Sequence, residues 1–196
     1  GQSPFAIGRG MQFERSLRKD GYARVLQLLR ERMGFAVEGT TVVYLRTGYP
    51  RNRQGLEQRA AETKRLVEGV IEGSTDAPNL LDGAVLTGEI AGNKAYFEAD
   101  AVAARFDGPI HAGEVKSFPV VDGRPEPDKL GAALDQVAVY LLLMRRLIAE
   151  LGGDPDSTVS TTAMLIAPRN VGLTPTLETQ QVSSRVRRID SLLSKP

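Results

Sequence analysis

The sequence predicts a single α/β domain over residues 1–196, with a mixed central sheet of about four or more strands flanked by helices. Short β-branched runs bounded by turn residues indicate strands, and longer stretches with apolar residues at helical spacing indicate helices. The composition agrees, because 41% hydrophobic and 25% charged residues are typical of a globular chain. A domain of this length buries enough surface to fold without disulfides or a structural metal.

The expected elements alternate along the chain. We expect helices within 10–34 and at 54–72, 129–151 and 180–193, and strands at 41–46, 84–90, 94–106, 110–118 and 161–167. Asp20-Gly21 interrupts the first helical region, and turn signals at 92–93 and 107–109 join three strands into a meander. Polar loops are expected at 73–83 and 121–128. The order is therefore helix, three strands, helix, strand, with a helical insertion at about 53–73 and a C-terminal helix at about 180–193.

Missing residue types exclude several chemistries. The chain has no Cys and one His, so iron–sulfur clusters, Cys-ligated zinc, thiol catalysis, disulfides and His-rich metal sites are excluded. The absence of Cys fits a reducing compartment, and we expect a cytoplasmic protein. No apolar stretch reaches the length of a membrane span. The start, Gly1-Gln2-Ser3, has neither a Met nor a signal-like apolar region, so we interpret it as an expression remnant or the cut end of a longer chain, and do not expect secretion.

The overall charge does not indicate a binding partner. Lys and Arg total 25 and Asp and Glu total 24, which gives a formal net charge of +1. Any nucleic-acid interface must therefore use basic residues that are gathered locally.

Acidic residues and a lysine recur at strand spacing in the middle of the chain. Glu98 and Asp100 are followed by Glu114 and Lys116, with 14 positions between Asp100 and Glu114. Alternate residues of a strand share a face, so two paired strands would bring these groups together. Asp100 and Glu114 supply the one or two carboxylates that Mg²⁺ takes in proteins, and Lys116 could steady an attacking water or the charge on a phosphate. Taken alone, such a tripeptide more often belongs to a solvated sheet face.

Two polar residues lie on one face of the helix that follows. Gln136 and Tyr140 are four positions apart and therefore stack on the same side of the helix. The alternative is that Tyr140 is a core aromatic residue and Gln136 a boundary polar residue.

These residues together resemble a known family. Asp100, Glu114-Val115-Lys116 and Gln136-x-x-x-Tyr140, in this order and spacing, resemble the motifs of the PD-(D/E)XK nuclease superfamily, and the last motif is similar to that of its RecB-like branch, which includes the CRISPR adaptation nucleases. The resemblance covers residues 8 to 168 and implies a restriction-endonuclease-like core of order αβββαβ. The iron–sulfur cysteines of several relatives are absent, so we expect no such cluster.

The resemblance implies a metal site. Asp100 and Glu114 would hold Mg²⁺ or Mn²⁺, helped by the backbone carbonyl of Val115. The segment 8–14 looks like the glycine-then-acid opening of the superfamily's first helix, which makes Glu14 a further ligand. The alternative for Glu14 is an acidic residue on a helix surface.

The resemblance also implies catalytic roles around that metal. Lys116 would position the nucleophilic water, and Gln136 would orient Lys116 or that water. Tyr140 would buttress the site or contact a phosphate. His111 lies on the opposite strand face from Glu114 by parity, and we interpret it as a residue beside a turn.

A basic and aromatic segment precedes the second helix. Arg46, Arg51 and Arg53 flank Tyr44 and Tyr49, and such residues can bind a nucleic-acid strand through phosphate contacts and base stacking. Solvated loop charge is the alternative. The arginines at 185, 187 and 188 are interpreted as a solvated helix face rather than a phosphate contact.

The leading hypothesis is a metal-dependent nuclease, endonuclease or exonuclease, that hydrolyses phosphodiester bonds in DNA by a metal-activated water, within a repair, defence or recombination system. A second hypothesis is a catalytically degenerate nuclease fold that binds DNA or assembles with other subunits of a repair or defence complex. A third is a sequence-specific endonuclease of the restriction type. DNA is the expected partner in each case, and no membrane is expected.

Overall fold

The structure, a computed structural model, describes residues 4–118, 126–169 and 172–194, with the side chains of the first helix from Met11 onward. Its elements are α1 (Pro4–Arg18), α2 (Ala23–Met33), β1 (Val42–Tyr44), α3 (Arg53–Ile71), β2 (Leu80–Ile90), β3 (Asn93–Ala103), β4 (Ile110–Val115), α4 (Pro127–Glu150), α5 (Pro155–Thr158), β5 (Val159–Pro168), β6 (Pro175–Gln181) and α6 (Ser183–Leu193).

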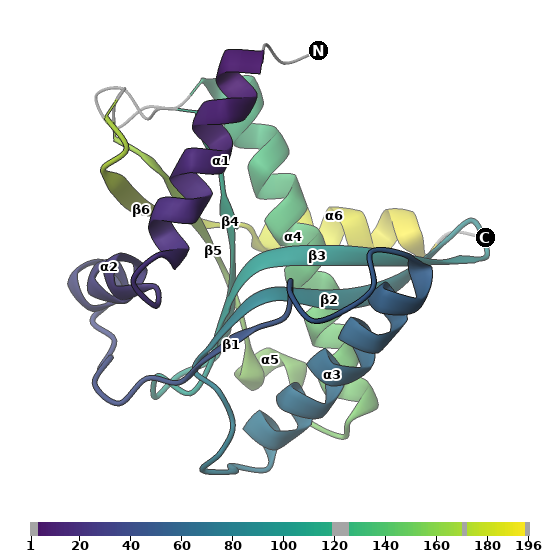
Figure 1. Ribbon diagram of the computed structural model, residues 1–196. Helices are drawn as coiled ribbons and strands as arrows, with labels where there is room; N and C mark the ends of the chain where they lie inside the picture. The colour runs from purple at the N-terminus through teal and green to yellow at the C-terminus, as the bar shows by residue number, and fades with distance from the viewer. Residues whose placement is uncertain (1–3, 119–125, 170–171, 195–196) are drawn as a thin grey trace.

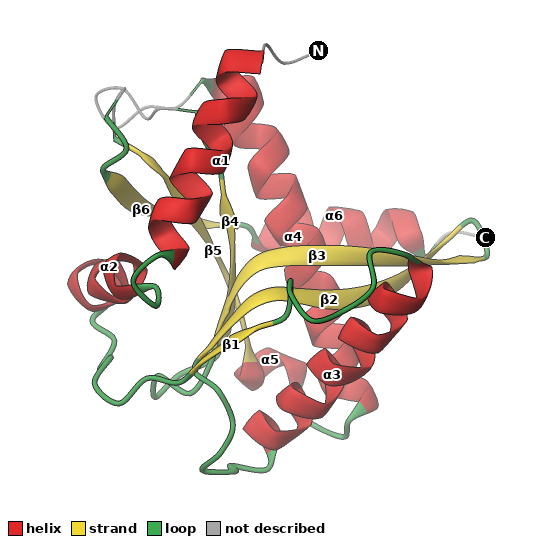
Figure 2. Cartoon of the chain, viewed as in Figure 1, coloured by secondary structure: helices red, strands yellow, loops and turns green. Residues whose placement is uncertain are grey.

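The strands form one mixed six-stranded sheet in the order β1-β2-β3-β4-β5-β6 (Figure 2). The pairs β2·β3, β3·β4 and β5·β6 are antiparallel, whereas β1·β2 and β4·β5 are parallel. A parallel pair requires a crossover connection, and α4 provides it between β4 and β5. The predicted α/β class, mixed sheet and three-stranded meander are confirmed.

Helices cover both faces of this sheet. Figure 1 shows α1 and α2 on one side of the sheet and α3, α4 and α6 on the other. Side chains alternate accordingly along β5, where Ala163 and Leu165 join the core under α4, and Met164 and Ile166 join the core under α1 and α2. Because both faces are buried, β5 is apolar almost throughout, which made it recognisable in the sequence.

Several expected boundaries are wrong, among them the end of the strand expected at 94–106, which the structure ends at Ala103. Strand β2 begins at Leu80 rather than at 84, because Leu80 and Leu81 pair with Ala103 and Val102, so the last four residues of the expected polar loop at 73–83 are strand. The strand expected to reach 118 ends at Val115. Most of the expected loop at 121–128 lies outside the described residues, and α4 begins at Pro127.

Strand β6 was not expected, and its last two residues were assigned to the C-terminal helix, which begins at Ser183. It is an edge strand with polar side chains at most positions, and only Pro175 and Leu177 are buried. Strand β6 is held in the sheet by its backbone pairing with β5, so its sequence does not need the apolar run that would have indicated a strand.

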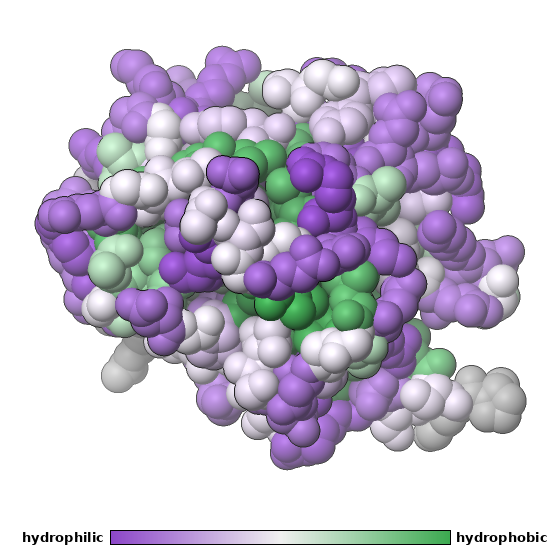
Figure 3. Space-filling model, turned by 90° about the horizontal axis from the view of Figure 1, so that it is seen from below, coloured by the Kyte–Doolittle hydropathy of each residue, from purple (hydrophilic) through white to green (hydrophobic). Residues whose placement is uncertain are grey.

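The surface is predominantly polar. Figure 3 shows one face of the molecule, on which hydrophilic side chains surround a narrow band of apolar ones. No helix within the described residues has the length and apolar character needed to cross a membrane.

Candidate active site

Asp100 and Glu114 lie opposite each other on adjacent strands. Ala101 of β3 pairs with Gly113 of β4, and the same antiparallel register places Asp100 across from Glu114. Directly opposite residues of an antiparallel pair point to the same face. The backbone N–H of Val115 donates a hydrogen bond to Asp100 Oδ2 at 2.8 Å, which fixes that carboxylate against β4. The strand pairing thus brings the two predicted carboxylates together.

Glu114 is a buried acid with an incomplete set of partners. Its residue is 6% exposed, and within the described part of the chain its Oε2 atom has no hydrogen-bond partner. Burial, together with the neighbouring Asp100, raises the pKa of Glu114 to about 9, although Tyr140 and Lys116 act in the opposite direction. Glu114 is therefore protonated at neutral pH in the metal-free protein.

The pKa of Asp100 shifts in the opposite direction from that of Glu114. Burial acts to raise the pKa of Asp100, but the protonated Glu114, the Val115 N–H and Arg46 outweigh it, so that the pKa lies below its usual value. The pair consequently holds one proton, on Glu114, and one negative charge, on Asp100. Such a pair arises when two carboxyl groups lie too close for both to ionise.

Lys116 and Tyr140 complete this end of the site. Lys116 Nζ lies 3.7 Å from Glu114 Oε1, and the lysine side chain remains partly accessible to solvent. Tyr140 projects from α4 and is buried, and burial together with Glu114 raises the pKa of its hydroxyl. Gln136, one turn earlier on α4, is exposed. The structure thus brings Asp100, Glu114, Lys116 and Tyr140 together, and the orienting role of Gln136 stays a prediction.

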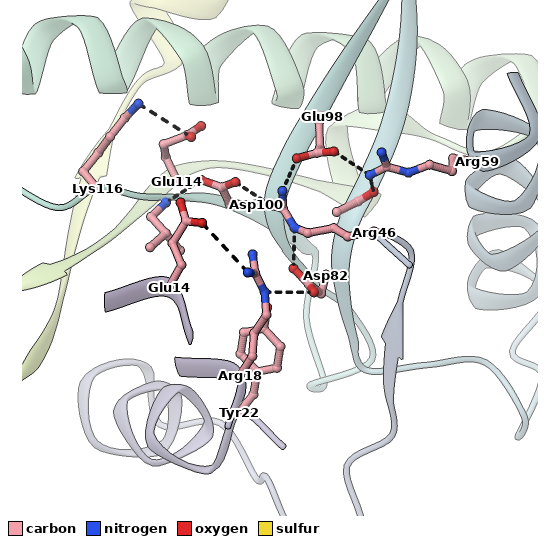
Figure 4. Close-up of polar contacts among 12 residues, drawn as sticks. Glu14, Arg18, Tyr22, Arg46, Arg59, Asp82, Glu98, Asp100, Glu114 and Lys116 are labelled. Carbon is pink, nitrogen blue, oxygen red and sulfur yellow. Dashed lines mark hydrogen bonds and ion pairs between the residues drawn. The ribbon is translucent and has the colours of Figure 1, made fainter. Parts of the chain in front are cut away.

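Arg46, just after β1, is shared by three carboxylates (Figure 4). Its Nε lies 2.9 Å from Asp82 Oδ1, its Nη2 lies 2.6 Å from Asp100 Oδ1, and its Nη1 pairs with Glu98 Oε1. These acids raise the pKa of Arg46 against the effect of burial. The guanidinium therefore neutralises and orients the acidic residues beside Glu114.

A glycine makes room for this arginine. Gly83 of β2 has a φ of +75°, and a Cβ there would collide with the Arg46 side chain and approach Arg59 Nη2. Arg59 comes from α3, and its Nη2 donates to the Gly83 carbonyl and to Glu98 Oε2, both at 2.6 Å. Two arginines thus cross β2 at Gly83, where the strand carries no side chain.

Asp82 and Arg18 are parts of the site that the sequence analysis missed. Asp82 is 2% exposed, and its Oδ2 lies 3.2 Å from Nε of Arg18 on α1. That Nε also donates to the Tyr22 hydroxyl at 3.2 Å. The signal for Asp82 was a lone acid in the apolar run 80–86, since a charge in a buried strand needs a partner.

Glu14 is connected to the site indirectly. Its Oε2 lies 3.9 Å from Nη1 of Arg18, which itself pairs with Asp82, and Figure 4 shows the Glu14 side chain reaching from α1 toward this cluster. Across the described ranges, no group of three or more His, Asp and Glu residues is arranged to hold a metal ion. Glu14 as a third metal ligand therefore stays a prediction.

The basic and aromatic segment forms a cavity beside the acidic site. Its volume is about 460 Å³, and all four residues predicted to bind nucleic acid, Arg46, Tyr49, Arg51 and Arg53, line it. The other lining residues are Pro50, Asn52, Leu56, Arg59 and Tyr96. Tyr44 lies elsewhere, with its ring centroid 5.8 Å from that of Tyr22.

Two other predictions about charged groups can be compared with the structure. His111 is buried with its ring 5.4 Å from that of Phe35, in the core on the α2 side, which confirms that it faces away from Glu114. Arg185 and Arg188 pair with Asp135 of α4 at 2.7 and 3.1 Å, so these arginines hold α6 against α4.

The donor set fits a hard divalent cation. Asp100, Glu114 and the Val115 carbonyl offer only oxygen ligands, which suits Mg²⁺ and Mn²⁺ rather than a thiophilic metal. A buried carboxyl oxygen without a partner, as at Glu114 Oε2, is costly unless a proton or a cation compensates it. No protein-family model matches this chain, and no curated protein sequence matches it.

Proposed function

We propose that this protein is a Mg²⁺- or Mn²⁺-dependent nuclease that hydrolyses phosphodiester bonds in DNA at the site formed by Asp100, Glu114 and Lys116. The observation that carries the proposal is the coupled carboxyl pair, in which Glu114 is buried, has an oxygen without a partner and has a pKa of about 9, beside an ionised Asp100. Strongly perturbed acids next to a lysine are typical of catalytic sites.

Asp100 and Glu114, with the Val115 carbonyl, would hold the divalent cation, which when bound acts as a Lewis acid on a phosphate oxygen. Glu114 must lose its proton before both of its oxygens can act as ligands. Arg46 and the Val115 N–H each bond one oxygen of Asp100, which fixes this carboxylate against β4, and a cation would have to share those oxygens with them or displace Arg46.

Lys116 would position the water and stabilise the developing charge. Its ammonium is held near Glu114 Oε1 at 3.7 Å and is partly exposed, so it can donate hydrogen bonds to a water or to a non-bridging phosphate oxygen. Tyr140 would help to restrain Glu114, because its buried hydroxyl on α4 is close enough to act on the pKa of that carboxyl. The chain forms no covalent bond to the substrate in this scheme, and its residues act by position and charge.

The succession of the β2-β3-β4 meander, α4 and the parallel strand β5 supports a restriction-endonuclease-like core, and with it membership of the RecB-like branch of the PD-(D/E)XK superfamily. We extend the proposal to a cytoplasmic role, alone or with other subunits of a DNA repair or defence complex.

A cleavage assay tests this function. Wild-type protein is incubated with labelled single-stranded, double-stranded and branched DNA and with Mg²⁺ or Mn²⁺. We expect cleavage of at least one form, which Lys116→Ala and Glu114→Gln both abolish while the matched surface variant Lys64→Ala retains it. No cleavage of any form by the wild type with either cation would reject the proposal.

The Arg46 contacts favour a second candidate function, a non-catalytic scaffold. A guanidinium shared by Asp82, Glu98 and Asp100 neutralises acidic side chains without any metal. In that case the protein would bind DNA or partner subunits with unchanged affinity when Lys116 is replaced by Ala, and it would not bind Mn²⁺.

A further inference from the structure

Most side chains that line the cavity beside the active site are cationic or aromatic. Four arginines and two tyrosines line its volume of about 460 Å³, and none of the described residues that line it is acidic. Arg51 and Arg53 are exposed at its rim, and the nearest ion pair of Arg53 is with Glu57 at 3.8 Å, too exposed to neutralise it well. Arg46 and Arg59 are already paired with carboxylates of the active site, so Arg51 and Arg53 supply the positive charge that is available to an anion in the cavity.

Two buried donors of the cavity have no acceptor. The Tyr96 hydroxyl and Arg59 Nε are shielded from solvent, and no described residue accepts a hydrogen bond from either atom. Arg59 is 9% exposed, and its Nη2 is already engaged by Glu98 and the Gly83 carbonyl. Buried donors without acceptors are rare in folded proteins, because each forfeits its hydrogen bond to water. Both atoms lack an acceptor oxygen, and because both are covered in this conformation, an anionic ligand in the cavity would supply one after the lining side chains shift.

The first turn of α3 adds to the positive potential. Asn52 Oδ1 caps the helix by accepting from the Gly55 N–H at 2.9 Å, and α3 continues for 19 residues. The Pro50 carbonyl packs so closely on Gly55 that any Cβ at this position would collide with it. This close approach folds the 50–53 segment over the helix N-terminus, whose dipole favours negative charge.

The cavity and the active site lie along the same strand. Tyr96, Glu98 and Asp100 occupy alternate positions of β3 and share a face, and four residues of strand span about 13 Å. Glu98 connects the two sites, because it pairs with Arg46 on one side and with Arg59 on the other. A nucleic-acid strand lying along β3 can therefore reach both sites at once.

We propose that this cavity binds a phosphate group of a single-stranded nucleic acid, a few nucleotides from the phosphodiester at Asp100 and Glu114. Tyr96 Oη and Arg59 Nε donate to the phosphate, Arg51 and Arg53 neutralise it, and the Tyr49 ring provides a surface on which a base can stack. The Tyr96 ring is already in contact with Arg53 and Lys94, whose cations lie 5.5 and 5.6 Å from its centroid. The phosphate is either the terminal monoester of a strand or an internal diester. The choice of DNA as substrate rests on the proposed nuclease function.

Binding measurements with matched variants test the proposal. Fluorescence anisotropy follows a labelled single-stranded oligonucleotide at low salt, with divalent cations chelated so that no cleavage occurs. Tyr96→Phe keeps the ring and removes only the hydroxyl, and its control is Tyr44→Phe outside the cavity. Arg53→Gln removes a charge from a side chain that is 66% exposed, and its control is Arg65→Gln on the same helix, where the side chain is 69% exposed.

We expect Tyr96→Phe to weaken binding by about 2- to 10-fold, as for loss of one hydrogen bond. We expect Arg53→Gln to weaken it by roughly 3- to 10-fold and to lower its salt dependence, while both controls stay within about twofold of wild type. Unchanged affinity in both cavity variants, or equal losses in the controls, would overturn the proposal.

The same assay distinguishes the two sources of phosphate. If the losses occur only with an oligonucleotide that carries a 5′-phosphate, the cavity holds a terminal monoester, and if they are equal with and without it, the cavity holds an internal diester. Because binding is measured without a divalent cation, failure of this proposal leaves the cleavage assay unaffected. Absence of cleavage likewise leaves this binding result standing.

Discussion

Glu114 on β4 lies directly across from Asp100 on β3, and at neutral pH the two carboxyl groups hold one proton between them. The proton favours Glu114 because one of its carboxyl oxygens has no hydrogen-bond partner among the described residues. Asp100, by contrast, accepts hydrogen bonds from the Val115 N–H and from Arg46, which stabilise its ionised form. Two carboxyl groups arranged in this way favour a proton or a cation between them, and we propose that a divalent cation takes the place of the proton in the active protein.

The first prediction concerns stability and pH. The folded protein holds the Glu114 proton more tightly than the unfolded chain, so Glu114 contributes stability that is complete below its usual pKa of 4.5 and is lost as pH rises toward about 9. In chelator, we expect urea unfolding to show a decline of a few kcal/mol over this window, on the order set by such a shift. Glu114→Gln should flatten the decline, and an equally steep decline in that variant would assign it to another group.

The second prediction concerns metal and protons. A cation that binds Glu114 must displace its proton, so Mn²⁺ affinity should increase with pH up to about 9, with release of close to one proton per site. Calorimetry in two buffers of different ionisation enthalpy measures this release. Lys116→Ala should still bind Mn²⁺, because an ammonium is not a ligand, and Glu114→Ala should not. Tight Zn²⁺ binding without Mn²⁺ binding would contradict the assignment.

The third prediction concerns Arg46. Replacing it by Gln leaves Asp82, Glu98 and Asp100 without the cation they share, and stranding buried charges typically costs about 3 to 5 kcal/mol. Arg188→Gln is the control, since its exposed pair with Asp135 should contribute less than about 1 kcal/mol. Denaturant unfolding measures both variants, and similar losses would show that the Arg46 cluster is an ordinary surface network.

The fourth prediction concerns Gly83. Gly83→Ala should lower both stability and cleavage, because the added methyl group displaces Arg46 and because φ is +75°. Gly92→Ala separates these effects, since Gly92 has a φ of +80° in the hairpin turn and no atom within 4 Å of an added Cβ. If cleavage and unfolding free energy fall equally in both variants, backbone strain alone explains the loss.

The strand pattern was sufficient to predict the carboxyl pair and the lysine. Strand side chains alternate with period two, so once turns at 92–93 and 107–109 define the meander, the positions of Asp100, Glu114 and Lys116 on one face follow. The same reasoning placed His111 on the opposite face. Helix spacing was less informative, because Tyr140 is buried at the site whereas Gln136, one turn away, is exposed.

The arginines around this pair could not be predicted in the same way. Arg18, Arg46 and Arg59 come from α1, the end of β1 and α3, three segments whose relative positions depend on tertiary packing rather than on local pattern. Asp82 was assigned to the polar loop expected at 73–83. In the structure Gly83, which follows it, instead opens β2 for two crossing arginines.

Anomalous diffraction from crystals soaked with Mn²⁺ is the most direct test of whether Asp100 and Glu114 form a metal site. We expect a single strong anomalous peak for Mn²⁺ within ligand distance, about 2.0 to 2.4 Å, of one oxygen from each carboxylate. The peak should vanish in Glu114→Ala and persist in Lys116→Ala. A wild-type crystal with no peak there at saturating Mn²⁺, and with Arg46 still bridging Asp82, Glu98 and Asp100, would contradict the metal-dependent nuclease and leave the scaffold.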